Sequence, residues 1–139
     1  MSTISLKKIL IVDDEPSILL SLSYVLKTEG VEVIACSEIE LAETALNATH
    51  FDLVIADIRM SGVNGIEGLE LLSYIRDRFD SKVIVMTGHV SNDTRNEAYR
   101  RGAYCYFQKP VDIPELLKQV SLAGIPVKNT AMRHSRNTT

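Results

Sequence analysis

The sequence predicts an α/β fold with a parallel sheet of five strands, and two observations support this. First, five apolar runs of strand length alternate with segments whose apolar residues recur every three to four positions, the spacing of a helix face. Strands that alternate with helices indicate βαβ units, which build parallel sheets. Second, polar residues that could carry chemistry follow directly after four of the five runs. Since the carboxyl ends of parallel strands share one edge, these residues should surround a single pocket.

The first half of the chain contains three of these runs and two amphipathic segments. The runs that we predict as strands are residues 8–12, 31–36 and 52–57. A helix is predicted over residues 16–29, because Pro16 suits a first helical turn and Gly30 a helix stop. The next helix should begin after Ser37, whose hydroxyl can cap it. Each helix has one apolar face, formed by Ile18, Leu19, Leu22, Val25 and Leu26 in the first and by Ile39, Leu41, Ala42, Ala45 and Leu46 in the second.

The second half continues the alternation after a loop at residues 58–65, which Gly62 and Gly65 punctuate. Strands are predicted at residues 82–87 and 104–108, and helices at about 66–79, 91–101 and 112–123. Leu69, Leu72 and Ile75 should face inward in the first of these helices, and the last has Leu116, Leu117 and Val120 as its apolar residues. The middle helix offers only Ala98 and Tyr99 as apolar anchors, so we expect it to be weakly held and to move readily.

Length and composition indicate one domain over residues 1–124, followed by a polar tail or linker stub over residues 125–139. The 139 residues, 45% of them hydrophobic, suffice for a core. The net charge of −3 points neither to nucleic acid nor to an anionic membrane as a partner. No apolar run approaches the roughly 20 residues of a membrane span. Cys36 and Cys105 lack CxxC or Cys/His spacing, which indicates buried cysteines in a reducing compartment. We therefore expect a cytoplasmic protein.

The polar residues at the predicted strand ends belong to four short motifs. They are the acidic pair Asp13-Asp14, Asp57 in DIRMSG, Thr87 in MTG and Lys109 in KP. In this order they resemble the receiver domain of two-component response regulators, over about residues 7–123. The runs ADIRMSGVNG, MTGH and RRGAY are most similar to receivers of sigma-54-type transcription activators. The resemblance implies a doubly wound, five-stranded parallel sheet in the order 2-1-3-4-5, with helices on both faces.

The resemblance also implies that Asp57 accepts a phosphoryl group with the help of Mg²⁺. A carboxylate is a weak nucleophile, so the transfer needs positioning and charge neutralisation more than a base. Mg²⁺ prefers hard oxygen ligands. The family assigns it to the side chains of Asp14 and Asp57, to Asp13 directly or through water, and to the backbone carbonyl of Arg59. Lys109 would pair with the phosphoryl oxygens as a point charge.

Phosphorylation would then reweight two conformations of the domain. By resemblance, the hydroxyl of Thr87 would move toward the phosphoryl group, and Tyr106 would swing inward behind it. The alternative for Tyr106 is an ordinary core or surface tyrosine. The energy for the switch would come from new charge-assisted bonds that form only in the active state. Because the predicted helix at 91–101 is weakly held, the expected output surface combines it with the strand at 104–108 and the helix at 112–123.

A few further positions follow from the same resemblance. Arg59 and His89 lie just after Asp57 and Thr87, where side chains shape the access of attacking water. Both should therefore modulate the lifetime of the phosphoryl group, although His89 could equally be a solvated loop histidine. Ser61 stands where the family usually has proline, which could loosen the loop. The family also implies a cis peptide bond between Lys109 and the following proline.

The function expected on these grounds is a signalling module that a sensor histidine kinase or phosphotransfer protein phosphorylates. It would catalyse its own phosphorylation and dephosphorylation and would not be an enzyme with a separate substrate. A tethered output domain that controls transcription is expected, and phosphorylation could drive formation of a homodimer. A free-standing receiver that acts by protein–protein binding, or a degenerate interaction scaffold, is the alternative.

Two other classes of protein fit the residues less well. A phosphatase of the haloacid dehalogenase type would need a second aspartate two residues after the nucleophile, and Arg59 stands there. A flavodoxin-like protein that binds FMN would need a loop that accepts a phosphate at a helix N-terminus. The loop after the first strand is acidic, with Asp13, Asp14 and Glu15, and would repel the flavin phosphate.

Overall fold

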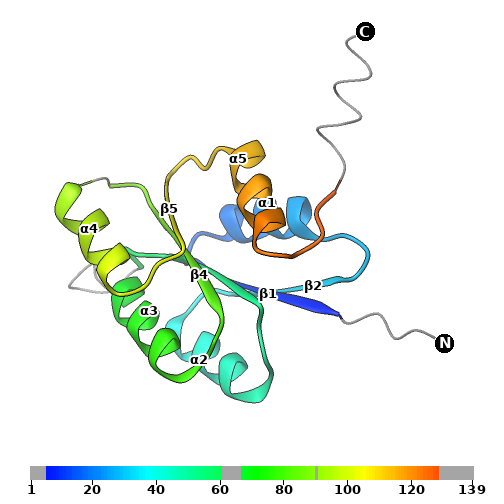
Figure 1. Cartoon of the computed structure of the whole chain (residues 1–139), viewed down its shortest axis with the longest axis horizontal. Coiled ribbons are helices and arrows are strands. Elements are labelled where there is room, and N and C mark those ends of the chain that lie inside the picture. Colours follow the sequence, from blue (N-terminus) through cyan, green and yellow to red (C-terminus); the bar gives the residue numbers. More distant parts are fainter. Residues whose placement is uncertain (1–5, 61–66, 90, 129–139) are drawn as a thin grey trace, which may run out of the picture.

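Five strands alternate with five helices in the described residues 6–60, 67–89 and 91–128 of a computed structural model (Figure 1). The strands are β1 (Lys7–Val12), β2 (Val31–Cys36), β3 (Leu53–Asp57), β4 (Lys82–Thr87) and β5 (Cys105–Gln108). The helices are α1 (Pro16–Leu26), α2 (Ile39–Ala48), α3 (Glu67–Arg78), α4 (Asn92–Arg100) and α5 (Ile113–Leu122). Among the helices in these ranges, none has the length and apolar character that crossing a bilayer requires.

The strands form one parallel sheet in the order β2-β1-β3-β4-β5, which confirms the predicted doubly wound topology. The register places Val12 beside both Cys36 and Ala56, and Asp57 beside Met86. All five residues of the central strand β3 are buried, as its continuous apolar run predicts. The carboxyl ends of β1, β3 and β4 are therefore nearly flush at one edge.

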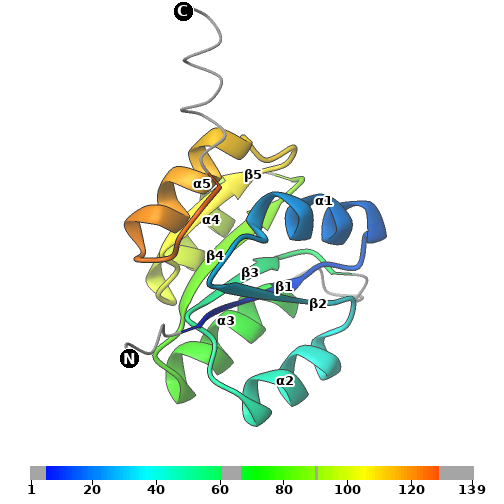
Figure 2. The same cartoon turned by 90° about the vertical axis from the view of Figure 1, so that its right-hand side faces the viewer.

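Helices cover both faces of this sheet, with α1 and α5 on one face and α2 and α3 on the other (Figure 2). Helix α4 packs on the same face as α2 and α3, through the buried Ala98. Because side chains alternate along a strand, β1 directs Ile9 and Ile11 to the α1/α5 face and Leu10 and Val12 to the opposite face. The buried helix residues are Leu22, Leu26, Leu116 and Val120 on the first face, and Ala42, Leu46, Leu69, Leu71, Leu72, Ile75 and Ala98 on the second. The predicted helix faces thus build the two halves of the core.

Helix α1 is shorter than predicted, since it ends at Leu26 rather than near residue 29. Lys27 already has an extended backbone, with φ −72° and ψ 124°. Gly30, with φ +83°, lies in the turn into β2, where its carbonyl accepts a 2.9 Å hydrogen bond from the backbone N–H of Lys7. The three polar residues after Leu26 have no apolar side chain to bury, so the chain leaves the helix there.

Three local expectations were wrong. Glu38, not Ser37, holds the N-cap position of α2, and no side chain caps this helix within the described residues, because Ser37 lies one residue too early. Leu41 is 51% exposed, since the face that α2 buries is set by Ala42 and Leu46. Cys105 is only half-buried, because the edge strand β5 is covered less completely than the central strands.

Some expectations fall on residues that the structure does not describe. These are Ser61, Gly62 and Gly65, the helix start at residue 66, and residues 129–139 of the predicted tail. The first residues after α5 are packed: Ile125 is buried in the α1/α5 core, and Val127 lies against the same cluster. The predicted tail over residues 125–139 therefore begins with side chains that belong to the core.

Candidate functional site

The flush carboxyl edge of the sheet brings the predicted polar residues into one place. Backbone hydrogen bonds continue past the strand ends: Ile58 N–H donates to Met86 at 2.8 Å, and Lys109 N–H donates to Thr87 at 2.7 Å. Asp13 N–H donates to Cys36 at 3.1 Å in the same way. These bonds fix the start of the loop after β1 to β2, and the starts of the loops after β3 and β5 to β4.

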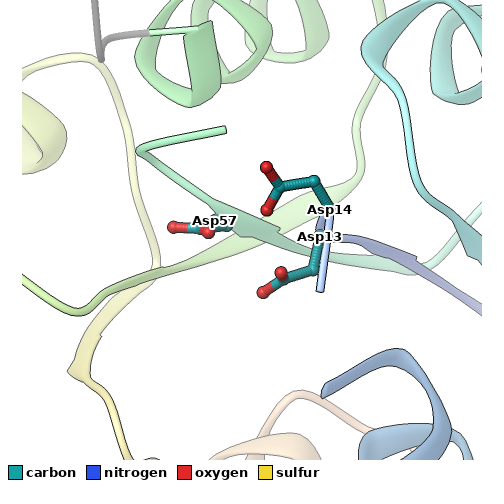
Figure 3. A group of neighbouring side chains, drawn as sticks. All are labelled: Asp13, Asp14 and Asp57. Atoms are coloured by element: carbon teal, nitrogen blue, oxygen red, sulfur yellow. The ribbon is translucent and has the colours of Figure 1, made fainter. Parts of the chain in front are cut away.

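Three carboxylates converge at this edge. Asp13 and Asp14 follow β1, and Asp57 ends β3, and one oxygen from each lies within 4.8 Å of the others (Figure 3). Asp13 is fully buried and Asp57 is 4% exposed, whereas Asp14 is half-buried. Buried carboxylates this close together repel one another, so the group requires positive charge.

Lys109 supplies part of that charge. Its ammonium Nζ lies 2.8 Å from Asp13 Oδ2, 3.0 Å from Asp57 Oδ2 and 2.8 Å from Glu15 Oε1. The Lys109 side chain is only 12% exposed, which strengthens these contacts by excluding water. The peptide bond between Lys109 and Pro110 is cis, as predicted.

The two ionisable groups at the centre of the site have shifted pKa values. Burial raises the pKa of Asp57, and Asp13 adds to that rise, while Lys109 and the backbone N–H of Arg59 oppose it. Burial by itself would lower the pKa of Lys109, but its contacts with Asp13, Glu15 and Asp57 outweigh burial and raise its pKa above the ordinary value. Lys109 therefore stays charged, and its ammonium contacts two of the three clustered aspartates.

The cluster of three carboxylates fits a hard divalent cation. Asp57 Oδ1 already accepts a 3.1 Å hydrogen bond from Arg59 N–H, and Asp13 Oδ1 accepts a 2.9 Å bond from Glu15 N–H. These bonds fix the orientation of the two buried side chains. The other oxygens of Asp13 and Asp57, which contact Lys109, and the carboxylate of the half-exposed Asp14 are the donor type that Mg²⁺ prefers.

Thr87 lies at the site, but its hydroxyl is engaged elsewhere. The side chain is fully buried at the end of β4. Its Oγ1 donates to the backbone carbonyl of His89 and accepts from the backbone N–H of His89, both at 3.1 Å. The hydroxyl would have to give up its bond to the His89 carbonyl before it could donate to a group on Asp57.

Tyr106 lies on β5, further from the three carboxylates. Its ring packs against the core on the α2/α3/α4 side and lies 6.4 Å from the ring of Tyr99, centroid to centroid. The hydroxyl is buried and has no hydrogen-bond partner among the described residues. Burial raises the pKa of this hydroxyl, and the backbone of Ser91 and the charge of Arg95 oppose the rise. The tyrosine thus already points inward against α4.

Arg59 and His89 contact the site through main-chain atoms, which hydrogen-bond to the side chains of Asp57 and Thr87. Both residues are exposed, and they follow Asp57 and Thr87 by two positions. The hydrogen bonds that link them to the site, within the described part of the chain, all use their main-chain atoms.

Sequence reasoning missed two residues at this site. Glu15 was noted only as part of an acidic loop, yet its carboxylate is a partner of Lys109. Gly68, in the first turn of α3, lies against the backbone of Asp57. Glu15 could have been proposed because it directly follows the acidic pair, whereas no local signal distinguishes Gly68.

A doubly wound sheet with three clustered aspartates and a lysine at the carboxyl edge of its strands is the architecture of a signal receiver. The chain belongs to the response regulator receiver domain family, whose sequence model matches residues 9–121. The match covers all five strands except the first residues of β1, and four complete helices.

Individual relatives agree with this assignment. The chain is 34% identical over 123 residues to sporulation initiation phosphotransferase F of Bacillus subtilis, covering 88% of this chain and 97% of that protein. It is 33% identical over 127 residues to the alginate biosynthesis transcriptional regulatory protein AlgB of Pseudomonas putida, covering 91% of this chain and 28% of AlgB. The chain spans about a quarter of the length of the first curated relatives it matches.

Solved structures are similar over most of the chain. The beryllofluoride-activated NtrC4 receiver domain dimer matches with a TM-score of 0.77 and 34% identity. That match covers 85% of this chain and 96% of the NtrC4 chain.

Proposed function

We propose that this receiver domain accepts a phosphoryl group on Asp57 in a reaction that depends on Mg²⁺. The observation that carries the proposal is the convergence of Asp13, Asp14 and Asp57 within 4.8 Å, with the ammonium of Lys109 in contact with two of them. Phosphoryl transfer relies almost entirely on positioning and charge neutralisation, and this site provides both.

The phosphoryl donor is the phosphohistidine of a sensor histidine kinase or a phosphotransfer protein. A carboxylate oxygen of Asp57 attacks the phosphorus, a P–O bond forms and the P–N bond to the imidazole breaks. The bonding electron pair stays on the imidazole nitrogen. Lys109, already 3.0 Å from Asp57 Oδ2, pairs with the oxygens of the transferred group. Arg59 N–H holds Asp57 Oδ1 and Lys109 Nζ holds Oδ2, so the carboxylate is oriented before a donor arrives.

The residues that would hold Mg²⁺ are Asp13, Asp14, Asp57 and the backbone carbonyl of Arg59. When bound, the ion neutralises negative charge on the phosphoryl oxygens. Asp13 and Asp57 are held in place by hydrogen bonds from the loop backbone, so little reorganisation is needed for binding.

The phosphoryl group would then bias α4, β5 and α5 toward an active arrangement. Thr87 exchanges its bond to the His89 carbonyl for one to the phosphoryl group. The side chain of Tyr106 then moves further inward, into the space behind Thr87. The side chains of Arg59 and His89 line the entrance and modulate the rate at which water removes the phosphoryl group. The module thus acts on its own phosphorylation state and turns over no separate substrate.

The output is proposed to be transcriptional, through a tethered domain. AlgB is named a transcriptional regulatory protein, and this chain covers only its receiver-sized part. The NtrC4 receiver was solved as an activated dimer, so phosphorylation is also proposed to drive homodimer formation. The setting would be the cytoplasm. With a net charge of −3, the domain would leave DNA binding to the output domain.

A second candidate is a free-standing phosphorelay intermediate. Sporulation initiation phosphotransferase F is covered over 97% of its length, so a receiver of this size can constitute a whole protein. Gene context distinguishes the two candidates, since an open reading frame that continues past residue 139 into an output domain would exclude the second.

The mass of the intact protein after incubation with acetyl phosphate and Mg²⁺ tests the acceptor directly. We expect a gain of one phosphoryl group in wild type. The gain should disappear in EDTA and in Asp57→Asn, which keeps the size of the side chain and removes the nucleophile. Equal labelling of Asp57→Asn would show that another residue is the acceptor. Absence of labelling in wild type would also contradict the proposal.

A further inference from the structure

We propose that Gly68, in the first turn of α3, is a positioning residue for the phosphoacceptor Asp57. The inference rests on the proposed function, because it concerns the placement of the same carboxylate. Gly68 contacts the acceptor through the main chain, and it was not part of the motif that identified the site.

The distances at Gly68 leave no room for a side chain. A Cβ atom there would lie 2.2 Å from the carbonyl oxygen of Asp57, 2.4 Å from Ile58 Cα and 2.8 Å from the carbonyl carbon of Asp57. All three neighbours are backbone atoms, so no rotamer change could relieve the overlap. The Gly68 N–H also donates a 2.9 Å hydrogen bond to the Ile58 carbonyl, which holds the helix turn against the end of β3.

Close approach is the remaining physical reason for glycine at this position. Glycine is a poor helix former, and Gly68 lies inside α3 without the positive φ that would demand it. Gly30, Gly102 and Gly124 do have positive φ, and a Cβ at Gly88 would meet open space. Among the glycines of residues 6–60, 67–89 and 91–128, only at Gly68 would a Cβ lie within 3.0 Å of another atom.

An added Cβ would be resisted from both sides. Helix α3 buries Leu69, Leu72 and Ile75, and Arg101 donates a 3.1 Å hydrogen bond to the Leu69 carbonyl, so the helix cannot withdraw freely. The end of β3 is held by the bond from Ile58 N–H to Met86. The overlap would therefore be shared, and part of the displacement would fall on the Asp57 peptide.

That displacement would act on the reacting group. The Asp57 carboxylate is placed by contacts of 3.0 Å to Lys109 Nζ and 3.1 Å to Arg59 N–H, and by its spacing from Asp13 and Asp14. A shift of a large fraction of an ångström would disturb all of these. Misplacement by about 1 Å can cost roughly 100-fold in rate.

Two measurements on Gly68→Ala test the inference in the whole chain. One is the affinity for Mg²⁺ alone, by calorimetry, and the other is the rate of phosphoryl incorporation from acetyl phosphate. We expect the rate to fall about 10- to 100-fold and Mg²⁺ binding to weaken measurably. Leu72→Ala is the matched control, because it loosens the same helix by removing a fully buried side chain and adds no atom near Asp57. Its rate and affinity should stay within about twofold of wild type at a temperature where it remains folded.

The outcomes separate this inference from the proposed function. Wild-type rate and affinity in Gly68→Ala, or equal losses in Leu72→Ala, would overturn the positioning role. If wild type itself takes up no phosphoryl group, the proposed function fails, and the Mg²⁺ affinities still decide whether Gly68 places Asp57. If Gly68→Ala is unfolded in buffer, all three proteins are compared in trimethylamine N-oxide, which favours the folded state.

Discussion

The ammonium of Lys109 contacts the carboxylates of Asp13, Glu15 and Asp57 at the same time. Asp13 and Asp57 are nearly without solvent, so each depends on this cation for compensation of its charge. Glu15 is more exposed, and its contact should contribute less. At the scale of single residues, the single positive charge of Lys109 therefore has to compensate the charge of two buried carboxylates.

Replacement of Lys109 should consequently reduce stability. Lys109→Ala leaves the Asp13 and Asp57 carboxylates buried without a cation, and we expect a loss of about 3 kcal/mol in the free energy of unfolding. Lys118→Ala, which removes an exposed lysine from α5, is the control and should change stability by less than about 0.5 kcal/mol. Urea denaturation in EDTA measures both. Equal small effects would show that the buried acids are compensated in another way.

A second prediction at this scale concerns the exposed pair of His50 and Asp80, 2.8 Å apart. The hydrogen bond and charge of His50 lower the pKa of Asp80, and Lys82 contributes least to that shift. A lowered pKa in the folded state means that the contact stabilises the protein above the unfolded pKa of Asp80. This stabilisation is lost as the pH falls through the folded pKa.

His50→Ala should therefore raise the pKa of Asp80, and Lys82→Ala should raise it less. Titration of the Asp80 side chain by NMR measures both shifts. A larger shift in Lys82→Ala than in His50→Ala would contradict the assignment of the partner.

Among the elements, α4 is the helix with the weakest anchorage. Ala98 is its one buried residue, whereas α1 buries Leu22 and Leu26 and packs further apolar residues against the core. Its amino end is capped by the Ser91 hydroxyl, which accepts a 3.0 Å hydrogen bond from Thr94 N–H. Few buried apolar contacts indicate a low free energy of local opening, so amide exchange should be faster in α4 than in α1.

Arg101 ties the carboxyl end of α4 to α3. It donates to the Leu69 carbonyl at 3.1 Å and to Ser73 Oγ at 3.3 Å, and it pairs with Glu97 at 2.6 Å. Arg101→Ala should therefore weaken amide protection in α4 by about tenfold, the equivalent of roughly one net hydrogen bond. Arg100→Ala is a close control, because Arg100 pairs with the same Glu97 but is 77% exposed. Similar exchange in the two variants would rule out Arg101 as the tether.

At the scale of the whole molecule, the three clustered carboxylates lie where β1 and β3 end, so a metal ion bound there would contribute to global stability. Asp13, Asp14 and Asp57 meet only when the central strands are paired in register, so the unfolded chain has no such site. A ligand that binds only the folded state stabilises it by mass action.

Mg²⁺ should thus raise the free energy of unfolding of wild type, by about 2.7 kcal/mol at a concentration 100 times its Kd. Asp14→Asn removes one proposed ligand without disturbing the contacts of Lys109, and it should lose most of this gain. Removal of Mg²⁺ with EDTA should return wild type to its metal-free stability. Thermal unfolding at a fixed range of Mg²⁺ concentrations measures these changes, and an equal gain in both proteins would place the ion elsewhere.

The alternation of strands and helices, and the position of the site, could be predicted from the sequence alone. Strand-length apolar runs and helical periodicity are local properties, and the topology of a parallel sheet places every strand end at a common edge. Asp13, Asp57, Thr87 and Lys109 needed no further information to be grouped.

Only the tertiary structure decided features that depend on distances between separate segments. The sequence could not show that Glu15 reaches Lys109, that α1 stops at Leu26, or that Leu41 faces outward. Least of all could it show that Gly68 lies against the Asp57 backbone. These features depend on how closely two elements approach, which is set by the packing of all their side chains together and by no single stretch of sequence.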